Sequence, residues 1–135
     1  MTAALQKLLT WLSPAFPVGA FAWSAGLETA IADRAVHDRA TTAQWVGAIL
    51  AHGGLRTDAI LLAHAHRHHA EAPVLRELAD LCLALTPASE RHAETALTGD
   101  AFVRAVAAWP LRTPPALPDP CPYPIAVGAL SAGHG

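Results

Sequence analysis

Residues 73–85 read PVLRELADLCLAL and carry the clearest helical pattern in the sequence. Apolar side chains recur there every three or four residues, which places them on one face of an α-helix. Pro73 suits the first turn of such a helix, because the N–H group it lacks would have no partner there. The predicted apolar face consists of Val74, Leu75, Leu78, Leu81, Cys82 and Leu85.

The same spacing continues on both sides of this stretch. The leucine stripe Leu5, Leu8, Leu9 and Leu12 predicts a short amphipathic helix at the start of the chain. No sustained alternation of apolar and polar residues occurs anywhere, so no sheet is expected and the fold class is all-α. Helices are predicted over residues 3–12, 24–36, 41–52, 57–69, 73–85 and 88–109.

Local signals suggest where these helices begin. Ser24 is a candidate N-cap, with Glu28 in the first turn where the helix dipole favours an anion. Thr41 with Gln44 has the form of a capping box, and Thr57 or Asp58 restarts a helix after two glycines. Thr86 is a candidate cap for the last long helix, followed by a proline at its first position. The last long helix is expected to bury Ala93, Leu97, Ala101, Phe102 and Val106.

Residues 110–124 form a different kind of segment, because seven of the fifteen are proline. Such a segment predicts an extended connection rather than a helix. An apolar helix begins after it and the sequence stops there. We therefore expect residues 1–135 to be the N-terminal part of a single all-α domain, an incomplete domain that ends at the start of a further helix.

Composition narrows the function classes. The formal charge is −2, with nine Lys and Arg against eleven Asp and Glu, so no basic excess favours nucleic acid. The two cysteines fit neither a disulfide framework nor a zinc pattern. We expect Cys82 to be a small core residue and Cys121, between two prolines, to be exposed.

Residues 8–27 contain no charged side chain, and Ala20-Phe21-Ala22 imitates a leader cleavage site. Pro14 and Pro17 interrupt any continuous helix through this run, which argues against a leader and against a membrane span. A cytoplasmic protein is the preferred interpretation. A secreted helical protein with a cleaved leader stays open as an alternative.

The sequence holds no recognisable nucleophile or phosphate-binding motif, so we expect neither an enzyme nor a cofactor. The visible cluster is His64, His66, His68 and His69. His64 and His68 are four residues apart, a spacing at which two imidazoles can hold a transition metal. A solvated helix face is the preferred interpretation, with no metal site predicted and these two as weak candidates. A nickel-binding protein that uses residues 64–69 is the alternative function.

Residues 13–28, SPAFPVGAFAWSAGLE, combine two prolines and two glycines with three aromatic side chains. They predict a rigid turn between two helices. Its aromatic residues Phe16, Phe21 and Trp23 either fill the core or offer an apolar surface to a partner. The residues alone leave both possibilities open.

With the preceding leucine helix, this stretch resembles the N-terminal signature of the UreF-type urease accessory proteins. Ser-Pro-x-x-Pro-Val-Gly, an aromatic-Ser pair and Gly-Leu-Glu stand here in the family's order. The segments TDAILLAHAHR, SERHAETALTGDAFVRAV and PYPIAVGALSAGHG are similar to later parts of the family. Members commonly have a glycine and a tyrosine where this chain has Ala20 and Trp23.

The resemblance implies a multi-helix bundle of the UreF type and a non-enzymatic chaperone role. Family members bind the accessory protein UreD, called UreH in some organisms, and together they recruit the GTPase UreG. The complex then delivers nickel to the urease apoprotein at the expense of GTP. The full-length protein is expected to form a homodimer. The residues expected at partner contacts are Pro17, Phe21, Trp23, Ser24 and Glu28.

Overall fold

The computed structural model describes residues 2–134, except for the side chain of Phe21. Within that range the regular structure is entirely helical, which confirms the predicted all-α class. The elements are α1 (Ala3–Trp11), the 3-10 helix η1 (Ala20–Ala22), α2 (Leu27–Ala32), α3 (Arg39–His52), α4 (Gly54–Arg67), α5 (Ala72–Ala84), α6 (Ser89–Val106) and α7 (Tyr123–Gly133).

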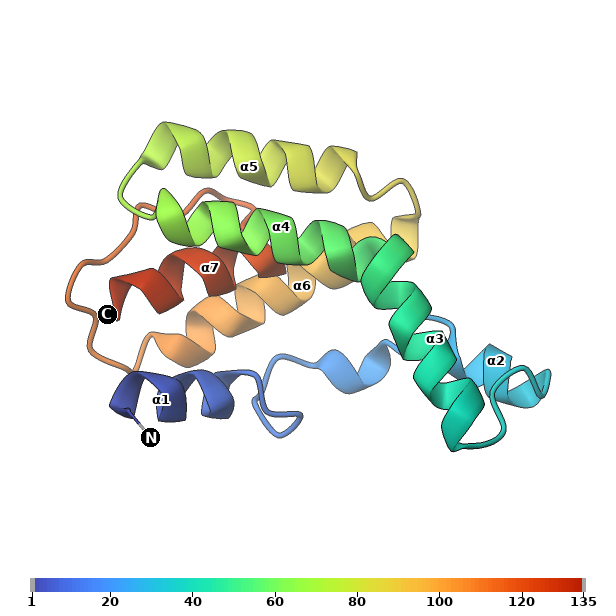
Figure 1. The fold of residues 1–135 in the computed structure, drawn as a ribbon. Coiled ribbons are helices and arrows are strands. Elements are labelled where there is room, and N and C mark those ends of the chain that lie inside the picture. Colours follow the sequence, from blue (N-terminus) through green and yellow to red (C-terminus); the bar gives the residue numbers. More distant parts are fainter. Residues whose placement is uncertain (1, 135) are drawn as a thin grey trace.

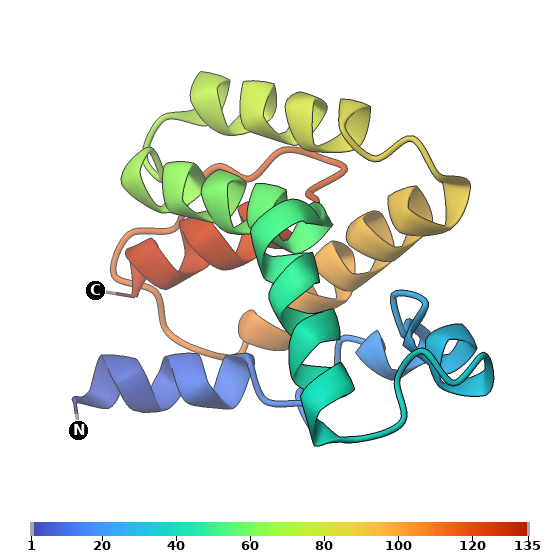
Figure 2. The same cartoon turned by 45° about the vertical axis from the view of Figure 1, so that its right-hand side comes forward.

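The helices form a bundle with an arm. Helices α4 and α5 lie side by side, α7 runs between α4 and α6, and α1 lies across the bundle below α6 (Figure 1). Helix α3 bends away from α4 by 50° and projects from the bundle, with α2 beside its far end (Figure 2). In the described part of the chain, no single helix is long and apolar enough to cross a membrane; α3 and α4 meet that test only as a bent pair.

Helix α7 is the centre of the core. It packs against α4, α6 and α5, and eight of its eleven residues are buried. Its sequence, YPIAVGALSAG, is uncharged and rich in small residues, so neighbouring helices approach it from several sides. The large buried side chains around it come from other elements: Trp11, Leu75, Phe102 and Val106.

Two glycines allow close approach at this core. A Cβ atom added to Gly128 of α7 would lie only 2.3 Å from the carbonyl oxygen of Leu62 in α4. A Cβ atom added to Gly99 of α6 would lie 2.0 Å from the carbonyl oxygen of Cys121. Both distances are far below van der Waals contact, so these positions exclude any side chain while the backbones keep their present separation.

The burial of Cys121 overturns the expectation that it is exposed. The proline-rich connection crosses α6 at Gly99, and only 4% of the Cys121 surface remains accessible. The N–H groups of Arg112 and Thr113 also donate to the carbonyl of Gly133 at the end of α7, at 3.0 and 3.2 Å. The connection is therefore packed against two helices rather than held in solvent.

Helix α1 confirms its predicted range but not its predicted inner face. Leu5, Leu9 and Leu12 are exposed, whereas Trp11 is buried and makes edge-to-face contacts with Phe102 and Trp109, each at a centroid distance of 5.8 Å. The indole ring buries more apolar surface than a leucine does, so it sets the rotation of the helix. Leu8 is the one residue of the leucine stripe that is half-buried.

Helices α5 and α6 also differ from the expected pattern. Leu75 and Cys82 are buried as predicted, but Leu81 and Leu85 on the same stripe are exposed, and Leu97 of α6 is 60% exposed. The prediction for these three leucines was wrong because periodicity marks an apolar face without giving its width. The buried face is narrower and is the face that packs against α4 and α7.

Helices α4 and α6 begin at other residues than predicted. Gly53 both ends α3 and precedes the first residue of α4, so α4 starts at Gly54 and not at Thr57 or Asp58. Thr86 does not cap α6; its hydroxyl donates to the carbonyls of Cys82 and Leu83 at 3.0 and 2.8 Å and so closes the end of α5. Helix α6 begins at Ser89.

A polar link joins α4 to α6. The guanidinium of Arg91 donates to Asp58 at 3.1 Å and to Glu94 within its own helix. Partial burial lowers the pKa of Arg91, but hydrogen bonding and attraction from Glu94 and attraction from Asp58 outweigh it and raise that pKa overall. Arg91 is therefore a permanent cation that fixes the helix pair next to the base of the arm.

Candidate partner-binding surface

The segment that joins α1 to α2 is attached to the bundle at its beginning. Val18 is buried, and the ring of half-buried Phe16 lies 5.7 Å from that of Phe102 in the core. Ser13 forms a tight turn, in which its hydroxyl oxygen accepts from the N–H of Ala15 at 3.2 Å. The aromatic residues of this segment were expected either to fill the core or to face a partner. Phe16 packs against the core.

A hollow of about 370 Å³ lies at this turn and is open to solvent. Its lining residues are Leu9, Thr10, Ser13, Ala15 and Phe16. Leu9 is 56% exposed, so an apolar rim faces outward there. A small-molecule site encloses its ligand and converges polar groups on it, whereas an open apolar hollow is typical of a protein contact.

The five predicted contact residues fall at the surface where they are described. Pro17, Ser24 and Glu28 are exposed, and Trp23 is half-buried. The side chain of Phe21 lies outside the described structure. No hydrogen bond or ring contact joins the four described side chains to one another. They are spread over the segment after α1 and the first turn of α2 rather than joined in a single site.

Ser24 does not cap α2, contrary to the prediction. The N-cap is Gly26, with a φ of 83°, and Ala25 before it also has a positive φ of 52°. Glycine adopts this left-handed conformation without strain. The N-cap of α2 is therefore Gly26, two residues after the predicted Ser24. Glu28 stands in the first turn of α2 as predicted. A Cβ atom on Gly26 would come to 4.0 Å from the ring of Trp45, so the start of α2 lies against α3.

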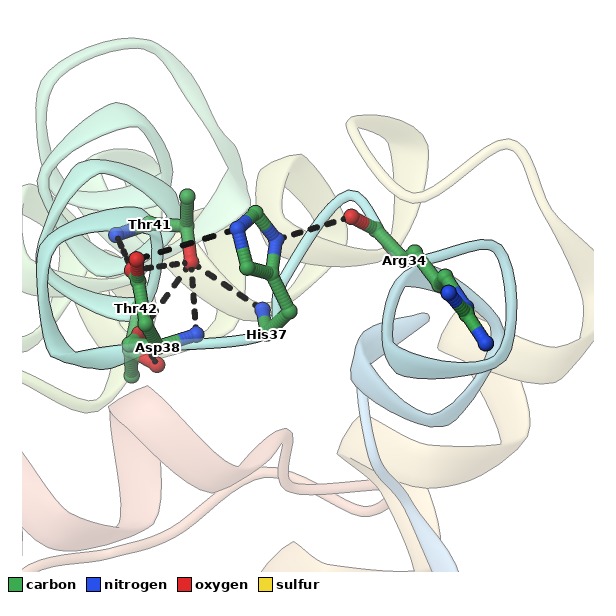
Figure 3. A network of polar contacts seen from close by, with 5 residues as sticks. All are labelled: Arg34, His37, Asp38, Thr41 and Thr42. Carbon is green, nitrogen blue, oxygen red and sulfur yellow. Dashed lines mark hydrogen bonds and ion pairs between the residues drawn. The ribbon is translucent and has the colours of Figure 1, made fainter.

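The loop between α2 and α3 is held by a polar network (Figure 3). The N-cap of α3 is Asp38, not Thr41: the Asp38 carboxylate accepts from the backbone N–H and the hydroxyl of Thr41, both at 2.8 Å. The Thr41 hydroxyl in turn accepts from the N–H groups of His37 and Asp38 at 3.0 Å. The His37 ring contacts the carbonyl of Arg34 at 2.9 Å, and Arg34 has a left-handed φ of 59°.

This network influences the charge of its carboxylate. The backbone and side-chain hydrogen bonds from Thr41 hold the pKa of Asp38 below its ordinary value of 3.8. Asp38 is therefore ionised at neutral pH, at the helix end where the dipole favours a negative charge. The network fixes the angle at which α3 leaves α2.

The arm carries an apolar surface that sequence reasoning missed. Ile31 of α2 and Val46 and Leu50 of α3 are 53%, 47% and 53% exposed, and we call these three residues the apolar arm surface. Helix α3 has no buried residue at all. Trp45 and Ile49 are half-buried, whereas Ala48 is exposed. The spacing of Val46 and Leu50, four residues apart on the next face, was the available signal.

The histidine cluster lies at the other end of α4. The rings of His64 and His68 are parallel within 6°, with centroids 6.3 Å apart. Nδ1 of His68 contacts Glu71 at 2.9 Å, and Nδ1 of His69 contacts the carbonyl of His66 at 3.2 Å. Within residues 2–134, no three His, Cys, Asp or Glu side chains converge as a ready-made metal site.

Both cysteine thiols are buried and have raised pKa values. Burial raises the pKa of the Cys82 thiol to about 11 and that of Cys121 to about 12. The thiolate is the reactive form, so both remain protonated, unreactive thiols at neutral pH. Cys82 confirms its predicted place in the core.

Comparison with known proteins gives a consistent result. A family model described as UreF matches residues 36–135. The chain is 52% identical over 132 residues to the urease accessory protein UreF of Rhizobium etli, which covers 98% of this chain and 59% of that protein. It is 50% identical to UreF of Agrobacterium fabrum over 98% of the chain, and 44% identical to UreF 1 of Brucella canis over 99%.

These matches reach beyond the family model. Residues 13–28, which carry the first resemblance, precede the part that the family model matches, yet the relatives align with nearly the whole chain. The chain spans about 59% of the length of the curated relatives it matches.

Proposed function

Because this chain belongs to the UreF family of urease accessory proteins, we propose that it assists GTP-dependent nickel insertion into urease by bridging UreD (UreH) and the GTPase UreG. The observation that carries the proposal is the 52% identity to a curated UreF across 98% of the chain. In this role the chain is a scaffold and not a catalyst. It works in the cytoplasm and reaches the urease apoprotein through the complex.

The exposed apolar groups support a docking role. The arm presents the apolar side chains of Ile31, Val46 and Leu50 to solvent, and exposed Leu9 stands at the open hollow that Phe16 also lines. Large exposed apolar groups that lie close together mark protein interfaces more often than free surface. In this proposal UreD covers the apolar arm surface, and apolar helical faces also contact a second copy of the full-length protein.

The contact residues predicted from the sequence are assigned to the same interface with UreD and UreG. We propose that Pro17, Phe21 and Trp23 contact UreD beside the apolar arm surface. Ser24 and Glu28 are exposed polar groups at the start of α2 and belong to the rim that engages UreG. Polar groups at an interface rim typically set specificity and association rate more than affinity.

Complementation tests the function. The chain is expressed with a urease gene cluster whose own UreF gene is deleted, and urease activity and bound nickel are measured. The proposal expects both to rise above the deletion background and expects UreD and UreG to co-purify with the chain. Background activity together with no complex at micromolar concentration would contradict it.

Glu28 allows a sharper test within that assay. Glu28→Ala is expected to weaken the retention of UreG while UreD still co-purifies. The matched control is Glu77→Ala, an exposed carboxylate on α5 away from the arm. If Glu28→Ala leaves assembly and urease activation intact, Glu28 acts only as a carboxylate at a helix start.

A further inference from the structure

We propose that His64 and His68 form a site for one divalent first-row transition-metal ion, with Glu71 as the positioning residue. The site lies on the last turn of α4 and the turn into α5, at the end of α4 that is remote from the arm (Figure 1). It would add metal binding to the docking role proposed above and does not depend on that role.

The helix already brings the two rings together. Side chains four residues apart lie one above the other on the same face of a helix. Here the imidazoles are parallel within 6° and their centroids lie 6.3 Å apart. Both rings are accessible to solvent, so a small rotation of exposed side chains is enough to aim one nitrogen of each at a shared ion. No backbone movement is needed.

Glu71 fixes the orientation of one ring. The N–H of Glu71 donates to the carbonyl of His68 at 2.9 Å, which closes the turn after α4. The same turn places a Glu71 carboxylate oxygen 2.9 Å from Nδ1 of His68. A carboxylate only accepts hydrogen bonds, so in the neutral imidazole Nδ1 carries the proton and Nε2 keeps a free lone pair. A carboxylate behind a metal-ligating imidazole is the usual arrangement in protein metal sites.

The remaining groups nearby define the limits of the site. No third His, Cys, Asp or Glu side chain within residues 2–134 completes the ligand set, so the other positions on a bound ion would be left to water. The ring of His69 is turned away from the pair, because its Nδ1 contacts the backbone carbonyl of His66. The site is therefore an open, exchangeable chelate of two imidazoles. Imidazole nitrogen suits Ni²⁺, Cu²⁺ and Zn²⁺ rather than Mg²⁺ or Ca²⁺.

Calorimetric titration with Ni²⁺ alone tests the site. The chain is expected to bind one ion, and His64→Ala and His68→Ala are each expected to abolish that stoichiometric binding. His66→Ala is the matched control, because it removes an imidazole from the same helix but not from the pair, and it should bind as the parent does. Circular dichroism verifies that every variant keeps its helix content.

The role of Glu71 needs its own comparison. Glu71→Ala should weaken affinity by about 10- to 100-fold, as loss of a carboxylate behind a ligand typically does. Glu71→Gln keeps an acceptor oxygen and should recover most of that loss. With Cu²⁺ as the probe, electron paramagnetic resonance should count two nitrogen ligands in the parent and one in His64→Ala.

Two outcomes would overturn the proposal. One is Ni²⁺ binding that neither His64→Ala nor His68→Ala changes. The other is a loss in His66→Ala as large as in the paired variants, which would mean non-specific uptake by a histidine-rich helix. Equal affinity of Glu71→Ala and parent would remove Glu71 from the site while leaving the histidine pair.

Discussion

Helices α7 and α3 are of similar length and are both rich in apolar residues, yet their surroundings are opposite. Helix α7 is enclosed by α4, α5 and α6 and buries Ile125, Ala126, Val127 and most of its other residues. Helix α3 has no buried residue and leaves Val46 and Leu50 in solvent. Apolar content alone therefore does not determine burial. Helix α7 is buried because its small residues let neighbours approach, whereas α3 projects beyond the reach of the bundle.

The contrast assigns the two helices different roles. Helix α7 stabilises the fold, so changes there should act on the free energy of unfolding. Helix α3 contributes little to the core, so changes there should act on partner binding. Each of the following variants tests one side of that division.

The largest effect is expected from Ile125→Ala. Ile125 is completely buried in α7, so truncation loses its transfer free energy and leaves a cavity, at a cost of about 2–5 kcal/mol. Chemical denaturation measures the loss. Ile125→Val should cost only about 0.5–1.5 kcal/mol, and equal costs for the two variants would show that the site is not tightly packed.

Gly128→Ala tests the close approach of α7 to α4. The added methyl group would meet the Leu62 carbonyl at 2.3 Å, so the two backbones must move apart at a cost of about 1–3 kcal/mol. The control is Gly47→Ala on α3, where an added Cβ atom meets nothing within 4 Å and helix propensity improves. A lower stability for Gly47→Ala than for Gly128→Ala would contradict the contrast.

Asp38 should make the start of α3 sensitive to acid. Its folded-state pKa is lowered, so its stabilising effect is full above the ordinary value of 3.8 and is lost as the pH falls through the lower folded value. Nuclear magnetic resonance of the Thr41 and Thr42 amides should show fraying of that turn in acid. Asp38→Asn keeps a capping oxygen without a titrating charge, so its turn should not respond to pH over this window.

The smallest effect on stability is expected from the double variant Val46→Ser, Leu50→Ser. Both side chains are about half-exposed and lie outside the core, so the two substitutions together should change the midpoint of chemical denaturation by the equivalent of about 1 kcal/mol or less. A loss as large as that of Ile125→Ala would mean that α3 packs against something within the fold. That result would remove the distinction between arm and core.

Sequence patterns gave the fold class and most helix ranges, because periodicity and proline positions are local features. They did not give the face that each helix buries, which depends on distant partners. Leu9 and Trp11 show this: both lie on α1, but only Trp11 meets the rings of Phe102 and Trp109. Cys121 is buried for a similar reason, since its neighbours Pro120 and Pro122 indicate a loop but not where the loop packs.

The role of the predicted contact residues stays a prediction, and the structure gives only their exposure. Pro17, Ser24 and Glu28 are exposed, as contact residues must be. The cap at Gly26 was missed because Ser24 is the stronger local signal, whereas the observed turn needs left-handed backbone. Val46 and Leu50 were missed because an apolar residue on a helix is by default assigned to the core. The 50° bend between α3 and α4 carries α3 away from the bundle, so these two residues are exposed instead.

The central claim is that the arm binds a partner while α7 holds the fold. The most direct test is the affinity of UreD for the double variant Val46→Ser, Leu50→Ser, measured beside the parent chain and Gln44→Ala, an exposed residue elsewhere on α3. We predict that the double variant keeps its unfolding transition but loses UreD binding, while Gln44→Ala binds as the parent does. Undiminished binding of UreD to a folded double variant would contradict the claim.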